Sequence, residues 1–213
     1  MTSNTDSPRL TVKALAELFP MPAYEQLRVL HDQKYPKQQP QSFRTPYYQP
    51  SLAGIRDFHR GGNDSRLLTS AQNDLQSIGN PARRAHNLRV LEKFANSRLL
   101  RRRLQPLPNT RYSANVGSVE IRLSPDLQAL ENGELVVIYF NCRTAAITDE
   151  IANLTVEIGN WVLEQNEIGI SHDHVEVVDL VAGNTHKRKK GRPSTIKTLK
   201  ANARIIEALW PTV

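Results

Sequence analysis

The sequence has little of several residue types, and each shortage excludes a class of protein. Its 213 residues include one cysteine, Cys142, which excludes an internal disulfide framework and a four-cysteine zinc site. No run approaches the 18 consecutive apolar residues of a membrane-spanning helix, and Met1–Pro8 lacks the basic and apolar pattern of a secretory signal. We therefore expect a cytoplasmic protein with no membrane partner. Apolar residues still make up 39% of the chain, enough for a packed core.

The charges are separated along the chain rather than mixed. The net charge is +7. Arg83–Arg111 holds nine basic residues and one acid, and the segment from His186 to the end holds eight basic residues and one acid. Between them, Tyr112–Thr185 holds twelve acids and two arginines. Basic segments of this kind favour a polyanionic partner, because phosphates respond to the local field. A solvated basic surface is the alternative interpretation.

The order of predicted elements indicates an α/β fold with a central mixed sheet of three to four strands flanked by helices. Residues 1–78 form a helical and proline-rich N-terminal region, residues 79–183 an α/β core, and residues 184–213 a basic linker with a C-terminal helix. Within the first region, Thr11 is placed to cap a helix and Pro36–Pro50 reads as a long arm. Gly61-Gly62-Asn63 predicts a turn.

A long arginine-bearing helix is predicted at the start of the core. Pro81 suits a first helical position, and apolar residues recur at positions 88, 91, 95 and 99. Arg84, Arg98 and Arg102 fall on the opposite side of this helix. The predicted helix thus presents a basic face.

The period then changes to that of strands. Arg111–Asn115 and Ser118–Leu123 predict two strands, and Leu135–Phe140 is an apolar run that fits a strand covered on both faces. The clearest amphipathic helix of the chain begins after Thr148, and Val175–Val181 predicts a further strand. A helix between two strands favours a right-handed crossover.

Leu123–Asn141 carries a combination of features that is known from one family of enzymes. Asp126 follows a strand, an Asn-Gly turn comes next, and an apolar strand ends in the triplet Tyr139-Phe140-Asn141. This pattern resembles the PD-(D/E)XK nuclease superfamily, particularly its RecB-like and CRISPR-associated exonuclease branch. The resemblance covers about half the chain, Gly79–Gly183. It implies a metal ligand at Asp126 and another at His86, which matches the manganese-binding histidine upstream of the core in that branch.

The triplet departs from the family's pattern. Where the family has an acid-x-lysine triplet, this chain has a neutral tyrosine and a neutral asparagine, Tyr139 and Asn141, which bring no negative charge to a hard divalent cation. The resemblance therefore implies a vestigial, non-catalytic centre at Asp126, Tyr139 and Asn141. We expect no cofactor unless Mg²⁺ or Mn²⁺ occupies the pocket of His86 and Asp126. A turn-forming aspartate and a surface histidine are the structural alternatives for those two residues.

The lysine-rich segment near the end resembles an AT-hook. Gly191-Arg192-Pro193 keeps the backbone extended and narrow, so that Arg192 can enter the minor groove of A·T-rich DNA. A solubility tail and an RNA contact are the alternatives. The predicted DNA-contacting residues are Arg84, Arg98, Arg101, Arg102, Arg103, Lys187, Arg188, Lys189, Lys190 and Arg192.

Three functions remain open at this point. The first is a non-catalytic, nuclease-like DNA-binding protein that acts as a subunit of a nucleic-acid-processing or defence complex, with a protein partner or a second copy of itself. The second is an active metal-dependent deoxyribonuclease in which Glu120 or Glu157 supplies the missing carboxylate. The third is an interaction protein that binds RNA or an acidic partner. We prefer the first and expect no efficient cleavage.

Overall fold

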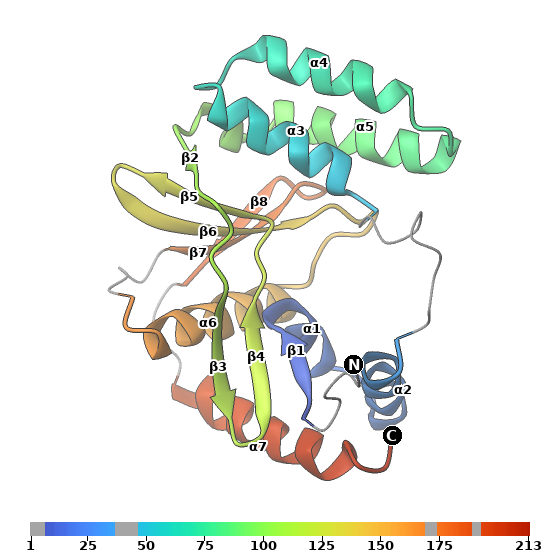
Figure 1. Cartoon of the computed structure of the whole chain (residues 1–213), viewed down its shortest axis with the longest axis vertical. Coiled ribbons are helices and arrows are strands. Elements are labelled where there is room, and N and C mark those ends of the chain that lie inside the picture. The colour runs from blue at the N-terminus through green and yellow to red at the C-terminus, as the bar shows by residue number, and fades with distance from the viewer. Residues whose placement is uncertain (1–6, 37–46, 169–173, 189–192) are drawn as a thin grey trace, which may run out of the picture.

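Two β-sheets and seven α-helices make up the described part of the chain, shown as a computed structural model in Figure 1. The structure describes residues 7–36, 47–168, 174–188 and 193–213, without the side chains of 193 and 194. The elements are β1 (Arg9–Thr11), α1 (Val12–Leu18), α2 (Ala23–Lys34), α3 (Gln49–Arg60), α4 (Ser65–Gln76), α5 (Pro81–Ala95), the 3₁₀ helix η2 (Arg98–Arg101), β2 (Gln105–Pro106), β3 (Tyr112–Val116), β4 (Val119–Leu123), β5 (Leu127–Glu131), β6 (Glu134–Asn141), α6 (Asp149–Gln165), β7 (Val175–Asp179), β8 (Asn184–Lys187) and α7 (Pro193–Leu209).

The larger sheet is mixed, which confirms the α/β class. Its strand order is β2-β5-β6-β7-β8, with β6 and β7 parallel and the other neighbours antiparallel. The helix α6 connects the two parallel strands, as the sequence predicted. The sheet has five strands, whereas three or four were expected. The sequence predicted β6 and β7 of this sheet but not β2, β5 and β8.

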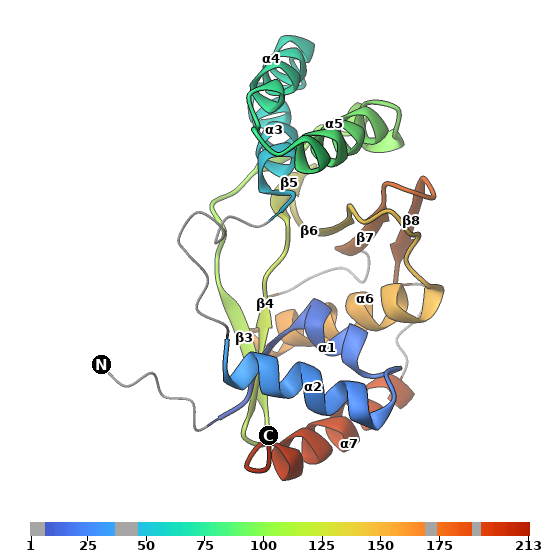
Figure 2. The same cartoon turned by 90° about the vertical axis from the view of Figure 1, so that its right-hand side faces the viewer.

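The predicted strands on either side of Gly117 do exist, but they belong to a second sheet. The strands β3 and β4 pair with each other, and β1 joins them parallel to β4. This second sheet lies with α1, α2, α6 and α7 on one side of the central sheet, while α3, α4 and α5 cover the other side (Figures 1 and 2).

The alternation of side chains along β6 explains why both faces are covered. Val136, Ile138 and Phe140 belong to the apolar cluster under α3, α4 and α5. Val137 and Tyr139 belong to the cluster that α1, α6 and α7 complete. The apolar run that predicted a strand buried on both faces is therefore confirmed.

Two helix starts were read correctly from local chemistry. The Thr11 hydroxyl accepts a hydrogen bond from the Ala14 amide at 3.2 Å, and the Thr148 hydroxyl accepts one from the Ile151 amide at 3.3 Å. Both satisfy amide groups that a helix leaves free in its first turn. The predicted turn is also present, with Gly62 at φ +70° and Asn63 at φ +68° joining α3 to α4.

The arginine-bearing helix is shorter than predicted. It ends at Ala95, where the Asn96 amide donates to the Glu92 and Phe94 carbonyls, and the chain then turns into η2. Arg98 and Arg102 consequently do not share a face of α5 with Arg84. The apolar spacing extends past the end of α5 because Leu99, which belongs to η2, is also buried in the core.

The three regions expected from the sequence share their cores. The first region contributes β1 and α1 to one cluster and α3 and α4 to the other. The helix α7 adds Leu199, Ala203 and Ile206 to the first cluster, and Trp210 joins it directly after the helix. Residues 37–46 of the proline-rich arm and residues 189–192 of the lysine-rich segment lie outside the described residues. Among the helices described, none has the length and apolar character needed to cross a bilayer.

Candidate functional site

Asp126 lies against the Tyr139–Asn141 triplet. Its Oδ2 accepts a hydrogen bond from the Phe140 amide at 2.7 Å, and its own amide donates to the Ile138 carbonyl at 3.0 Å. Asp126 directly precedes β5, and the antiparallel register of β5 with β6 sets Leu127 opposite Ile138. The hairpin thus sets Asp126 opposite Tyr139, two of the three residues that the sequence assigned to one centre.

Two cations that the sequence did not indicate complete this centre. The Lys13 ammonium donates to the Phe140 carbonyl at 3.2 Å, and Arg56 Nη1 donates to the Asp126 carbonyl at 3.1 Å. Burial raises the pKa of the Asp126 carboxyl, while Lys13, the Phe140 amide and Arg56 act in the opposite direction. Lys13 comes from α1, far away along the chain, so no local pattern connects it to Asp126.

Tyr139 and Asn141 add no negative charge here. Burial raises the pKa of Tyr139 well above its usual range, with a further increase from Asp126, so the phenol keeps its proton. The Asn141 amide donates to the Asp179 carboxylate at 3.2 Å and to the Ala145 carbonyl at 2.9 Å. The Asp179 carboxylate also accepts the amides of residues 147, 181 and 182, so it braces the ends of the strands.

The other residues proposed for a metal site have partners elsewhere. The His86 Nδ1 is 2.9 Å from the Tyr47 hydroxyl. Glu120 pairs with Arg9 and Arg122, and Glu157 pairs with Arg188. Neither glutamate therefore supplies the missing carboxylate to Asp126. Within the ranges that the structure describes, no three histidine, cysteine or acidic side chains gather as a metal site would require. The metal role of His86 and Asp126 stays a prediction.

Cys142 follows the triplet and is buried. Burial, with a smaller contribution from Asp126, raises the pKa of its thiol to about 12. Cys142 therefore keeps its proton near neutral pH. Because the nucleophile is the thiolate and not the thiol, this side chain is unreactive there. Cys142 packs in the apolar cluster under α3, α4 and α5.

Arg102 is tied into the central sheet instead of standing free for DNA. It forms a bidentate pair with Glu131 and a second pair with Glu176, with N–O distances of 2.5 to 3.0 Å. Burial opposes its charge, but the hydrogen bonds to the two glutamates outweigh burial and raise the pKa of Arg102. Lys187 joins the same group, 2.8 Å from the Glu176 carboxylate. Glu176 is buried at the centre of this ionic cluster, with 1% of its side chain exposed, while Arg102, Glu131 and Lys187 are partly exposed.

Arg188 likewise forms ion pairs within the protein. Its side chain is 11% exposed and pairs with Glu157 at 3.2 Å and with Glu164 at 2.8 Å. The acidic middle of the chain therefore binds part of both basic segments. Charges that are separated along the sequence are therefore in part neutralised in the folded protein.

The remaining arginines of the first basic segment are open to solvent. Arg98, Arg101 and Arg103 are exposed, and none of them pairs with a carboxylate of the described residues. Arg103 and Arg60 line a groove of about 980 Å³ between the end of α3 and residues 103–108. Arg84 is half-buried, with Nη1 3.4 Å from the Gln76 carbonyl.

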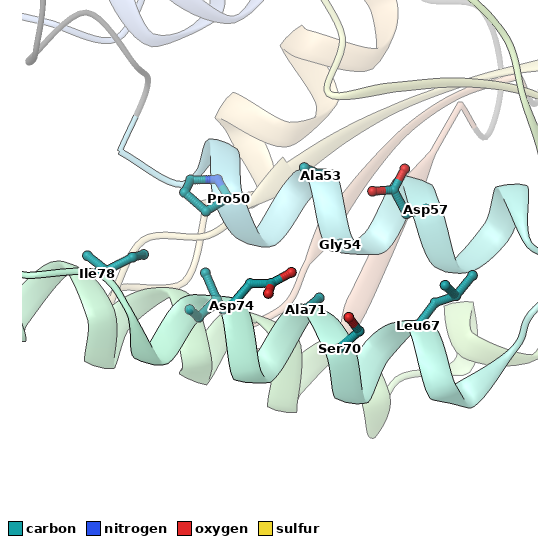
Figure 3. Close-up of a pocket in the computed structure, with 10 residues that line it drawn as sticks. Pro50, Ala53, Gly54, Asp57, Leu67, Ser70, Ala71, Asp74 and Ile78 are labelled. Atoms are coloured by element: carbon teal, nitrogen blue, oxygen red, sulfur yellow. The ribbon is translucent and has the colours of Figure 1, made fainter.

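A second hollow has the opposite charge. It measures about 290 Å³ and lies between α3 and α4, with Asp57 and Asp74 projecting from the two helices (Figure 3). Gly54 and Ala71 allow these helices to come close, because a Cβ on Gly54 would lie 2.7 Å from the Ala71 Cβ. Two carboxylates make this hollow unsuited to a polyanion.

Comparison with known proteins adds no family to this description. The sequence matches no model of a protein family, and no curated protein sequence is detectably similar to it.

Proposed function

We propose that this chain is a non-catalytic, nuclease-like DNA-binding protein that acts as a subunit of a nucleic-acid-processing or defence complex. The proposal includes the cytoplasmic location expected from the sequence. The observation that carries it is the environment of Asp126, which faces a triplet without charge and gives one oxygen to the Phe140 amide. A hard divalent cation prefers several anionic oxygens, and this donor set does not fit one.

The exposed arginines support the DNA-binding part of the proposal. Arg103 lines the groove at the end of α3, and Arg98 and Arg101 are exposed on η2, shortly before it in the chain. None of the three charges is neutralised by a described carboxylate. Each phosphate contact of a protein releases counterions, which makes binding depend on salt. Arg102, Lys187 and Arg188 are withdrawn from this surface by their ion pairs.

Binding of duplex DNA at several salt concentrations tests the proposal. Replacing Arg98, Arg101 and Arg103 together by glutamine is expected to weaken binding and reduce the slope of log K against log salt by roughly 0.9 per lost phosphate contact. The matched control replaces three exposed arginines of other elements, Arg28, Arg66 and Arg204. Equal effects of the two triple variants would contradict the proposal, and tighter binding of RNA would favour the third function.

Lys13 is the one observation that favours an active nuclease. It places a cation beside Asp126 although position 141 is asparagine instead of lysine. The test incubates the protein with linear and single-stranded DNA in Mg²⁺ or Mn²⁺. We expect no cleavage; cleavage that is lost in both Asp126→Ala and Lys13→Met would establish the enzyme.

A further inference from the structure

A small cavity lies at the carboxyl ends of the parallel strands β6 and β7. It has a volume of about 60 Å³ and is bounded by α5, by the loop after β6 and by the residues that follow β7. Its polar lining comes from Arg89, Lys93, Asn141, Arg143 and Thr144. In open α/β sheets, ligands bind in the crevice outside the carboxyl ends of the strands, so this position favours a binding site.

Arg89 enters this cavity without an anionic partner. Its Nη2 atom is buried and makes no hydrogen bond to any described residue. A desolvated cationic donor without a partner is unfavourable, because it has lost water and gained nothing in return. Lys93, one helical turn further along α5, also forms no ion pair within the described ranges. A bound anion would give the Arg89 Nη2 donor an acceptor, and the exposed Lys93 ammonium would attract it.

The surrounding charges do not compete for these two cations. The cavity lining contains no carboxylate. Asp179 lies at the same strand ends, but its oxygens accept three backbone amides and the Asn141 side chain. Glu17 pairs with Arg143 at 2.9 Å, and that arginine is 62% exposed. Two unneutralised cations and one exchangeable cation therefore face the cavity.

The rim is held in place before any ligand arrives. The Asn141 Oδ1 accepts the Arg143 amide at 3.3 Å, while its Nδ2 donates to the Ala145 carbonyl at 2.9 Å. The Val181 amide is fixed by Asp179 at 2.8 Å. Both loops are thus shaped by side chains at the strand ends, which is the preorganisation that a specific site needs.

We infer that this cavity binds a single phosphate monoester through Arg89, Lys93 and Arg143. The size admits one compact group, and two unpaired cations balance the two charges of a monoester better than the single charge of a diester. The planar guanidinium of Arg89 suits a tetrahedral oxyanion through paired hydrogen bonds. The terminal phosphate of a nucleic-acid strand is one source, and this source rests on the function proposed above. A small phosphorylated molecule is the other.

The test measures binding of inorganic phosphate to the full chain by calorimetry, with Arg89→Gln and Lys93→Gln as variants. Each substitution is expected to weaken phosphate binding about tenfold or more, since each removes a charge-assisted hydrogen bond. Arg66→Gln, on the exposed face of α4, is the matched control and is expected to bind phosphate as the wild type does. Because Lys93 is exposed, its variant tests the inference even where Arg89→Gln fails to fold.

Oligonucleotides of one sequence, with a 5′-phosphate, a 3′-phosphate or hydroxyl ends, separate the sources. Tighter binding of one phosphorylated strand, lost in Lys93→Gln, supports the strand end. Phosphate binding that depends on Lys93 without any preference among the strands supports a small phosphorylated ligand. Wild-type protein that does not bind phosphate, or variants that bind it unchanged, would overturn the inference. Salt-dependent DNA binding through Arg98, Arg101 and Arg103 would then still stand.

Discussion

At the scale of single residues, Asp126 is half-buried and takes part in the backbone network. Its carboxyl accepts the Phe140 amide, yet burial raises its pKa above that of an exposed aspartate. The folded state therefore holds this proton more firmly than the unfolded state. Stability from this group is present at pH values below its unfolded pKa and is lost as the pH rises through the folded pKa.

We predict that Asp126→Asn removes this pH dependence. Asparagine keeps an oxygen for the Phe140 amide but cannot ionise. The free energy of unfolding of the variant, relative to the wild type, should therefore rise from pH 3 to pH 7 in urea titrations. Asp64→Asn is a control of opposite sign, because hydrogen bonds from Arg66 lower the pKa of Asp64. A relative stability of Asp126→Asn that stays level or declines with pH would refute the prediction.

Arg102 permits a second prediction at this scale. Arg102→Gln leaves the buried Glu176 with Lys187 alone and should cost about 3 kcal/mol, the lower end for breaking a buried pair. Hydrogen bonds from Arg102 lower the pKa of Glu131, so that contribution exists above the unfolded pKa and fades in acid. The deficit measured by urea unfolding should thus shrink below pH 4.5. Arg98→Gln, on an exposed side chain, should change stability by at most about 0.5 kcal/mol.

At the scale of elements, the contact between α3 and α4 depends on a missing side chain. The Cβ that alanine would add at Gly54 meets the Ala71 Cβ at 2.7 Å, which the close packing of the two helices does not allow. Alanine is the better helix former, so propensity and packing act in opposite directions. Packing should dominate, because both atoms belong to rigid helix positions.

Gly54→Ala is therefore expected to destabilise the protein by roughly 1–3 kcal/mol, as overpacked cores do. The measurement is the midpoint of urea unfolding with an unchanged slope. Gly79→Ala is the matched substitution, since a Cβ there meets nothing within 4 Å. Equal midpoints for the two variants would show that α3 and α4 adjust at no cost.

The C-terminal helix is a structural element as well as a neighbour of the basic segment. Leu199, Ala203 and Ile206 of α7, with Trp210 directly after the helix, are buried in the cluster beneath the central sheet. Truncation after Thr185 should consequently abolish cooperative thermal unfolding, followed by circular dichroism. A truncated chain that melts cooperatively would contradict the role given to α7.

Joint replacement of Lys189, Lys190 and Arg192 by alanine should leave the thermal transition in place. Salt-dependent DNA binding of this triple variant, compared with the wild type, then tests the AT-hook resemblance.

At the scale of the whole molecule, local patterns were readable and distant pairings were not. Thr11 and Thr148 marked helix starts because capping involves neighbours a few residues away. The strand β5 was missed because Leu-Gln-Ala-Leu-Glu fits a helix as well as a strand. The helix α3 did carry a signal, with Leu52, Ile55 and Phe58 three residues apart, but Pro50 and Gly54 obscured it.

The same limit applies to the candidate site. Asp126 and the triplet were placed together because a short hairpin connects them. Lys13 and the partners of Arg102 were invisible, since each comes from an element that only the tertiary fold brings close. Counting charges along the chain consequently overstated the cations available to DNA.

The parallel pairing of β1 with β4 constrains how the protein folds during translation. Arg9 lies opposite Glu120, so the first strand emerges from the ribosome long before its neighbour has been translated. At a translation rate of 5–20 residues per second, β4 follows β1 after roughly 5 to 20 s. During that time the apolar face of α1 remains exposed. We expect this stretch to be where molecular chaperones first engage the growing polypeptide.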